Sequence, residues 1–218
     1  MKTVFASLAL MAALTLAPAA EAATLSNVPT SEYVYAFGWP NTETYGQVFV
    51  APITGTLDSF TLYLNGGVGD IRGAVGTWNG TAAHDFGFGS PATLYTSAPV
   101  DSGAGGAFTF MPGVSVTAGS LYVAFLTVFG LTDTQLTTAM PLGTDLAGGG
   151  YFVWNNDDGS GLGPFGNTAW NYFFETGSVL FEAKFTPASP AAIPLPAGLP
   201  LLLLALGGLG LAARRRGA

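Results

Sequence analysis

The feature that most constrains this 218-residue chain is the alternation of apolar and polar residues through its middle. One apolar face is formed by Phe60, Leu62 and Leu64, and another by Val179, Phe181, Ala183 and Phe185. A repeat of two is the period at which the side chains of a strand change face. No stretch of this region carries the apolar stripe of an amphipathic helix. The middle of the chain is therefore predicted to consist of β-strands.

Other segments extend this prediction. Strands are expected at 46–51, 71–78, 93–96, 108–111, 114–117 and 151–154, and Tyr33, Tyr35 and Phe37 are expected to share one face. The segment Leu121–Leu126 is apolar on both faces, as a central strand covered on both sides would be. Turns separate the segments at Asn65–Gly67, Asn79–Gly80, Pro112–Gly113, Ala118–Gly119 and Asp158–Gly159. We expect an all-β domain over residues 23–187, an antiparallel β-sandwich of jelly-roll type.

The first 22 residues have the pattern of a signal peptide. Lys2 supplies a positive charge, an apolar run follows from Val4 to Leu16, and small residues surround Glu21. This is the order of the charged region, apolar region and cleavage site of an exported protein. The sequence predicts a signal helix over 1–22 and cleavage between Ala22 and Ala23.

Residues 188–218 are predicted to form a second processing segment. A spacer rich in proline and alanine leads to a proline motif, then an apolar run over 198–213, and then Arg214, Arg215 and Arg216. A helix over 199–213 would be about 22 Å long, short for a bilayer core of about 30 Å. We therefore expect a weak transmembrane anchor, with the arginines held on the cytoplasmic side by the positive-inside rule.

The proline motif reads Ile193-Pro194-Leu195-Pro196-Ala197. Together with the leucine- and glycine-rich run and the arginine cluster, it resembles the VPLPA-CTERM sorting signal, a relative of the PEP-CTERM signals, with isoleucine in place of valine. The resemblance implies recognition by a membrane-embedded exosortase and release toward the cell surface, in bacteria that make extracellular polysaccharide and biofilm. An ordinary type I membrane anchor is the alternative.

The middle domain also resembles uncharacterised β-sandwich modules of secreted bacterial proteins. The resemblance lies in the runs 49–52, 55–64, 78–80, 94–97 and 121–126. Those modules are similar in pattern to carbohydrate-binding sandwiches. The likeness implies the fold and leaves the ligand open, because one sandwich architecture hosts many functions.

Charge and cysteine content exclude several classes of function. Between Ala23 and Pro187 the only basic residues are Arg72 and Lys184, against twelve acids, which gives this region a net charge of −10. A basic footprint for nucleic acid is therefore absent. The chain has no cysteine, which excludes thiol catalysis and cysteine-ligated metals.

No residue pattern raises a catalytic site above background. The single histidine, His84, stands in a glycine-rich stretch, where a solvated loop is the simpler interpretation. A pair of carboxylates in a cleft would suit a glycosidase, and acids that could supply it are Asp70, Asp145, Asp157, Asp158 and Glu175. Sequence alone cannot pair them, and we expect no enzymatic activity.

Two binding chemistries remain as candidates. Asp157 and Asp158 lie in an oxygen-rich run that calcium accepts, although the spacing of a dedicated calcium loop is missing and no cofactor is otherwise expected. The domain has four tryptophans, Trp39, Trp78, Trp154 and Trp170, and in Trp78-Asn79-Gly80 and Trp170-Asn171-Tyr172 the ring stands beside an amide in a predicted turn. Trp78 and Trp170 are therefore the candidate platforms for stacking against sugar rings, with core packing as the alternative.

Together these observations predict an exported protein of the cell surface or extracellular matrix. It would pass the inner membrane, be anchored there transiently, and then be released by an exosortase to bind extracellular polysaccharide. The alternatives are a structural coat component without glycan affinity, an inner-membrane-anchored protein with a periplasmic domain, and a hydrolase with an unrecognised carboxylate pair.

Overall fold

The computed structural model describes residues 21–79, 92–131, 136–156, 165, 170–171 and 177–189. Within them the chain forms strands and no α-helix. In chain order these are β1 (Ala23–Ser26), β2 (Pro29–Phe37), β3 (Thr44–Val50), β4 (Gly55–Leu64), β5 (Asp70–Thr77), β6 (Ala92–Thr96), β7 (Val100–Asp101), β8 (Gly106–Phe110), β9 (Val114–Val116), β10 (Leu121–Thr127), β11 (Thr138–Gly143), β12 (Gly150–Asn155), β13 (Ser178–Val179) and β14 (Phe181–Pro187). The predicted all-β fold is confirmed.

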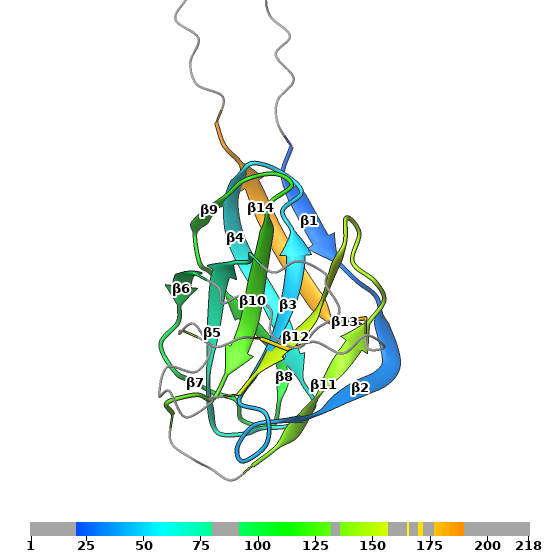
Figure 1. The fold of residues 1–218 in the computed structure, drawn as a ribbon, viewed down its shortest axis with the longest axis vertical. Coiled ribbons are helices and arrows are strands. Elements are labelled where there is room, and N and C mark those ends of the chain that lie inside the picture. Colours follow the sequence, from blue (N-terminus) through cyan, green and yellow to red (C-terminus); the bar gives the residue numbers. More distant parts are fainter. Residues whose placement is uncertain are drawn as a thin grey trace, which may run out of the picture. The chain divides into compact units, whose positions relative to one another are not determined.

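The strands are antiparallel throughout and form three sheets (Figure 1). One sheet has the order β1-β14-β4-β8, with β9 also paired to β4. The second has the order β12-β3-β10-β5-β6, with β7 also paired to β5. A small third sheet, β13-β11-β2, continues the first because β1 leads into β2 and β13 leads into β14. The layers make a sandwich-like fold.

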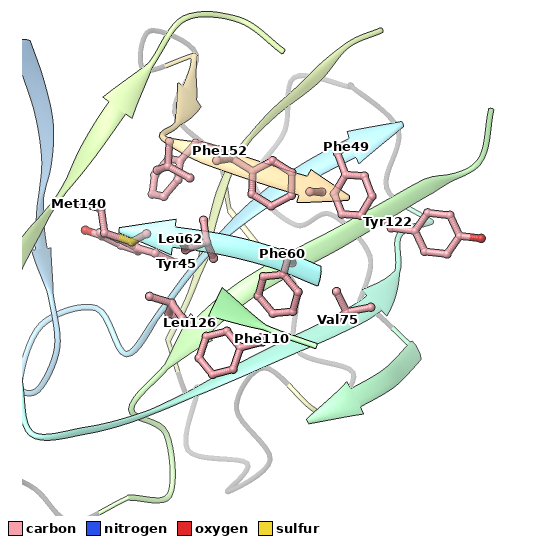
Figure 2. Close-up of a cluster of buried hydrophobic side chains, with 14 of the residues drawn as sticks. Tyr45, Phe49, Phe60, Leu62, Val75, Phe110, Tyr122, Leu126, Met140 and Phe152 are labelled. Atoms are coloured by element: carbon pink, nitrogen blue, oxygen red, sulfur yellow. The ribbon is translucent and has the colours of Figure 1, made fainter. Parts of the chain in front are cut away.

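Apolar side chains from the two large sheets meet in one main core (Figure 2). Phe60 and Leu62 from β4 face Phe49 and Leu126 from the opposite sheet, and Met140 extends the core into the small sheet. All five are completely buried. The inward faces predicted for β4 and for the segment 179–185 are therefore confirmed, since their alternate apolar residues belong to this core.

Strand β10 is covered on both faces, as its sequence predicts. Tyr122, Ala124 and Leu126 belong to the main core between the sheets. Val123 and Phe125 point the other way, into a second apolar cluster on the outer face of the same sheet. This second cluster also holds Trp78 and Trp170, and it decides how those two residues are interpreted below.

The expected face on β2 is wrong. Tyr33 and Tyr35 are exposed, whereas Val34 and Phe37 are buried in the main core. The pairing with β11 shifts register between Thr138, opposite Phe37, and Ala139, opposite Tyr35. This irregularity places an extra residue in β2, so the inward positions are 34 and 37 instead of an unbroken alternate series.

The chain divides into two compact units, Met1–Ala188 and Ser189–Ala218. All the described strands belong to the first unit. Its first and last strands are neighbours, because Ala23 in β1 pairs with Phe185 in β14. Residues 1–20 of the predicted signal helix (1–22) and the predicted transmembrane helix over 198–213 lie outside the described residues, and Glu21 and Ala22, which are described, are not helical. In the part that the structure describes, no helix has the length and hydropathy needed to cross a bilayer.

Candidate functional site: an exposed aromatic strip on β2

The two tryptophans predicted to be sugar platforms are buried. Trp78 is 5% exposed and Trp170 is 0% exposed. Their rings meet edge to face with centroids 5.8 Å apart, and Trp170 also meets Phe125 at 5.1 Å. The indole N–H of Trp78 donates a hydrogen bond of 2.8 Å to the hydroxyl of Tyr151. In the described structure both rings pack in an apolar cluster and neither offers a face to a sugar.

The reason for this burial is the second apolar cluster on the outer face of the large sheet. Trp170 lies over Gly46, where a Cβ atom would come within 3.1 Å of the ring. The backbone around Trp170 is held in place by Asn171, which exchanges two hydrogen bonds of 2.8 and 2.9 Å with the backbone of Trp154. The segment at Trp170 and Asn171 therefore pairs with β12, and nothing in its local sequence predicts this pairing.

The other predicted site residues are not brought together by the described structure. Asp70 begins β5 and Asp145 follows β11, and both are exposed. Among the described residues no three His, Cys, Asp or Glu side chains gather as metal ligands. Several predictions fall outside the described residues, namely His84, the calcium candidates Asp157 and Asp158, Glu175, the motif Ile193–Ala197 and the arginines Arg214–Arg216. Of the predicted signal cleavage site, Ala22 precedes β1 and Ala23 begins it.

A different set of aromatic residues is exposed. Tyr33 and Tyr35 on β2 are 52% and 69% exposed, and Trp39, in the turn that follows, is 39% exposed. We call these three residues the aromatic strip. Two exposed apolar residues lie near its ends, Val28 before β2 and Leu136 before β11. Most of the large apolar side chains exposed in the described structure are therefore gathered around one edge strand.

The strip stands on a well-anchored support. β2 pairs with β11, where Pro141 lies opposite Tyr33 and Ala139 opposite Tyr35. The hydroxyl of Tyr35 is 2.9 Å from the hydroxyl of Thr137, so the outer end of an exposed ring has a hydrogen-bond partner. The two faces of β2 therefore differ in burial. Val34 and Phe37 lie in the core, whereas the tyrosine rings at 33 and 35 lie in solvent.

The turn that carries Trp39 is also held by the backbone. Gly38 donates a hydrogen bond of 2.8 Å to the carbonyl of Thr42 and accepts one of 2.9 Å from Asn41. Gly38 has a φ of +115° and lies directly against the carbonyl of Leu136. A side chain at position 38 would meet both obstacles, so glycine is required for the close approach that places Trp39 beside the start of β11.

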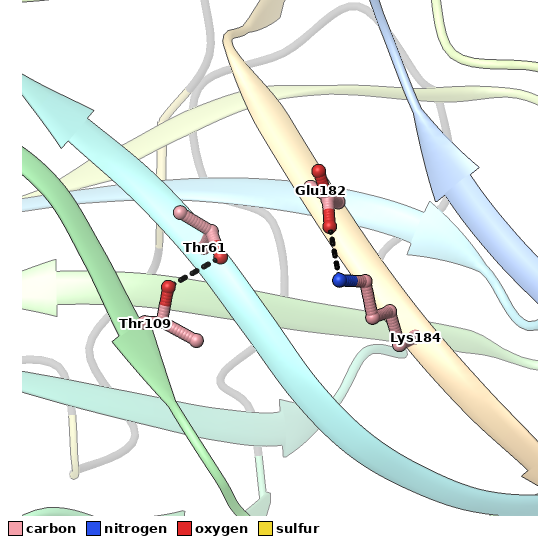
Figure 3. A network of polar contacts seen from close by, with 4 residues as sticks. All are labelled: Thr61, Thr109, Glu182 and Lys184. Carbon is pink, nitrogen blue, oxygen red and sulfur yellow. Dashed lines mark hydrogen bonds and ion pairs between the residues drawn. The ribbon is translucent and has the colours of Figure 1, made fainter.

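The two basic residues of the domain lie on strands other than β2. Lys184 belongs to β14 and forms an exposed ion pair of 3.0 Å with Glu182 on the same strand (Figure 3). Arg72 belongs to β5, where it lies opposite Thr127 of β10. Glu32, on β2 itself, is exposed and stands next to Tyr33 in the chain. The aromatic strip therefore has a carboxylate near it and no basic residue on its own sheet.

The outer face of the first sheet carries paired polar side chains. Thr61 and Thr109 share a hydrogen bond of 2.8 Å between their hydroxyls, close to the Glu182–Lys184 pair (Figure 3). These groups satisfy one another along neighbouring strands. The exposed ion pair contributes little to stability, and the one aromatic residue of β4 on this face, Tyr63, is only partly exposed. This face is a weaker candidate than the aromatic strip.

Sequence reasoning missed the strip because both faces of β2 carry apolar residues. Tyr33, Tyr35 and Phe37 fit one alternate series, and Val34 and Ala36 fit the other. No residue pattern near Ala36 predicts the register shift that turns the side chain of Phe37 inward. The polar run Thr30-Ser31-Glu32 before Tyr33 is the one available signal that this strand lies at an edge.

Comparison with protein-family models, with curated proteins and with solved structures finds no match for this chain.

Proposed function

We propose that this chain is an exported protein of the cell surface or extracellular matrix whose β-domain binds polysaccharide without chemical turnover. One observation supports it above the others. The described fold begins with β1 at Ala23 and ends with β14 at Pro187. The two segments with the sequence features of a signal peptide and a sorting tail stand before and after that fold.

The way the ends of the domain are built fits processing on both sides. Ala23 and Leu25 lie in β1, and Leu25 is buried in the main core. Cleavage after Ala22 would leave β1 intact and still paired with β14. The motif Ile193–Ala197 stands beyond Pro187, so exosortase cleavage there would remove no strand of the described domain. Signal peptidase and exosortase are the implied partners, together with the inner membrane during transit.

The finer features of the fold belong to the same proposal. The chain crosses repeatedly between the two large sheets, from β3 to β4, from β4 to β5 and from β9 to β10. Such crossings support a jelly-roll-like sandwich. A helical signal segment over 1–20 and a helical anchor over 198–213 complete the proposed precursor. An experimentally determined structure of the precursor would test these three features directly.

Binding without turnover is the part of the proposal that separates it from its alternatives. The experiment is a titration of the processed protein with polysaccharide from the producing cells, followed by analysis of the sugar for new reducing ends. Saturable binding with an unchanged polymer is expected. New reducing ends would identify a hydrolase, and the absence of any binding would identify a structural coat component. Either result would overturn the proposed function.

A further inference from the structure

We infer that the aromatic strip, Tyr33, Tyr35 and Trp39, is a docking site for a neutral polysaccharide chain. The inference rests on the proposed glycan-binding function, and it adds the site and the class of glycan. The strip replaces the buried Trp78 and Trp170 as the surface against which sugar rings would stack.

The spacing of the rings suits an extended ligand. Tyr33 and Tyr35 are alternate residues on one face of β2, so their Cα atoms lie about 6.6 Å apart along the strand. Trp39 follows in the turn at the end of the same strand. Two exposed aromatic rings therefore follow one another along β2, and a third stands in the turn after it. A chain of sugar units lying along this edge can place apolar ring faces against successive side chains.

The strip is also prepared for binding before the ligand arrives. The Thr137 hydroxyl holds the hydroxyl of Tyr35 at 2.9 Å, while most of the ring stays exposed. Beneath the strip, Val34 and Phe37 anchor β2 in the main core. Binding would therefore order few additional side chains, which lowers its entropic cost. Surface tyrosines without such support lose more freedom when they stack.

The size of the strip favours a glycan over a second protein. With the exposed fractions given above, the three rings present on the order of 300 Å². A stable protein interface buries about 800 Å² on each partner. The smaller area matches a few sugar units, and the hydroxyls of Tyr33, Tyr35 and Thr137 can bond to the hydroxyl groups of a sugar.

The charge distribution selects a neutral glycan. The region from Ala23 to Pro187 carries a net charge of −10, and its two basic residues, Arg72 and Lys184, lie on other sheets. Glu32 adds a carboxylate beside the strip. A polymer rich in uronic acid or phosphate would be repelled, whereas an uncharged chain would meet no electrostatic penalty. The same charge disfavours docking on an anionic membrane.

The test compares binding of the processed protein to two sets of polymers. The neutral set holds xyloglucan, galactomannan, mixed-linkage β-glucan and the neutral polysaccharide fraction of the producing cells. The anionic set holds alginate and the cells' own anionic fraction. We expect binding to the neutral set, with little change between low and high salt. Affinity should fall roughly tenfold for each of Tyr33→Ala, Tyr35→Ala and Trp39→Ala, because each ring covers on the order of 50 Å² of sugar.

Matched variants separate stacking from other effects. Tyr63→Ala on the first sheet and Met111→Ala, where the side chain is 77% exposed, remove apolar surface away from the strip and should leave affinity unchanged. Tyr35→Phe keeps the ring and removes its bond to Thr137, so it should lose less affinity than Tyr35→Ala. Melting temperatures of all variants show whether any loss comes from unfolding.

The outcomes distinguish this inference from the proposed function. If the wild-type protein binds polysaccharide and the three strip variants bind equally well, the inference is wrong and the proposed function stands. Preference for the anionic set with strong salt dependence also overturns the inference alone. No binding to any polymer overturns both. A dimer that dissociates in the strip variants would identify a second copy of the chain as the occupant and would contradict the inference.

Discussion

Gln47 is the buried amide that ties the two layers together at the small sheet. Its carbonyl oxygen accepts a hydrogen bond of 2.9 Å from the backbone N–H of Val179, and its amide nitrogen donates to the Ser178 hydroxyl at 3.1 Å and to the Val48 carbonyl at 2.9 Å. Gln47 is completely buried. The polar atoms of a buried amide need hydrogen-bond partners, and those of Gln47 have three.

Replacing Gln47 by leucine should therefore destabilise the domain. The change leaves the Val179 N–H and the Ser178 hydroxyl without this partner, and we expect a loss of about 2–4 kcal/mol in the free energy of unfolding. Urea denaturation measures it. The control is Thr61→Val, which removes a partly exposed hydroxyl pair and should cost less than about 1 kcal/mol. Equal losses for both variants would show that Gln47 has no special role in joining the layers.

Tyr45 makes the free energy of unfolding depend on pH in the alkaline range. Burial raises the pKa of its hydroxyl above the ordinary value of 10.0, and a hydrogen bond with Thr42 opposes that shift. The folded state therefore holds this proton more tightly than the unfolded state. The contribution to stability is complete below pH 10 and is lost as the pH rises from there through the pKa of the folded state.

Denaturation of wild type and Tyr45→Phe between pH 8 and about pH 11 isolates this effect. The wild-type stability should fall more steeply above pH 10, because phenylalanine has no proton to lose. The two proteins are identical at every other position, so the difference between their curves reports the Tyr45 hydroxyl alone. Parallel curves would mean that the Tyr45 hydroxyl titrates alike in the folded and unfolded states, contrary to the account.

At the scale of elements, Gly46 decides how β3 meets the segment around Trp170. A Cβ atom at position 46 would lie 3.0 Å from Val123, 3.1 Å from Phe125 and 3.1 Å from the Trp170 ring. In an open strand, glycine to alanine gains stability by restricting the unfolded chain. Here Gly46→Ala should instead cost about 1–3 kcal/mol, because the added methyl overpacks the second cluster.

A double-mutant cycle tests the cause of that loss. Trp170→Phe makes room beside position 46, so Gly46→Ala should cost less in that background than in wild type. Denaturation of the four proteins provides the coupling free energy. Strictly additive losses would indicate that the methyl is opposed by the strands alone and that Trp170 does not pack on Gly46 as described.

The elements also show which parts of the fold a sequence can predict. Alternation identified β4, β14 and the doubly covered β10, because in these strands each side chain's environment repeats every two residues. It missed β1 and β7, which are short and partly polar, and β11, which is interrupted by Pro141. Local patterns contain little information on a strand that is stabilised mainly by its neighbours.

The candidate site was harder to predict for a related reason. Exposure of a tryptophan depends on which distant segment covers it, and Trp78 is covered by Trp170 and Tyr151. The face of Tyr33 and Tyr35 depends on one register shift against β11. Both are properties of long-range pairing. The residue types needed for a stacking surface were visible in the sequence, whereas their exposure was not.

At the scale of the whole molecule, the proposed route depends on the proline motif. Replacing Pro194 and Pro196 by alanine should block exosortase cleavage and hold the protein in the inner membrane with Arg214–Arg216 attached. Fractionation followed by immunoblotting measures this. The matched control replaces Pro187 and Pro190 outside the motif and should leave release unchanged. Normal release of the motif variant would indicate that release does not depend on recognition of the proline motif by an exosortase.

The most direct test of the central claim is the intact mass of the protein recovered from the cell surface, combined with sequencing of its first residues. The account predicts a chain that begins at Ala23, keeps β14 through Pro187, and lacks Arg214–Arg216. A surface protein that still begins at Met1, or that still carries the three arginines, would contradict the claim that this domain is exported and released by processing at both ends.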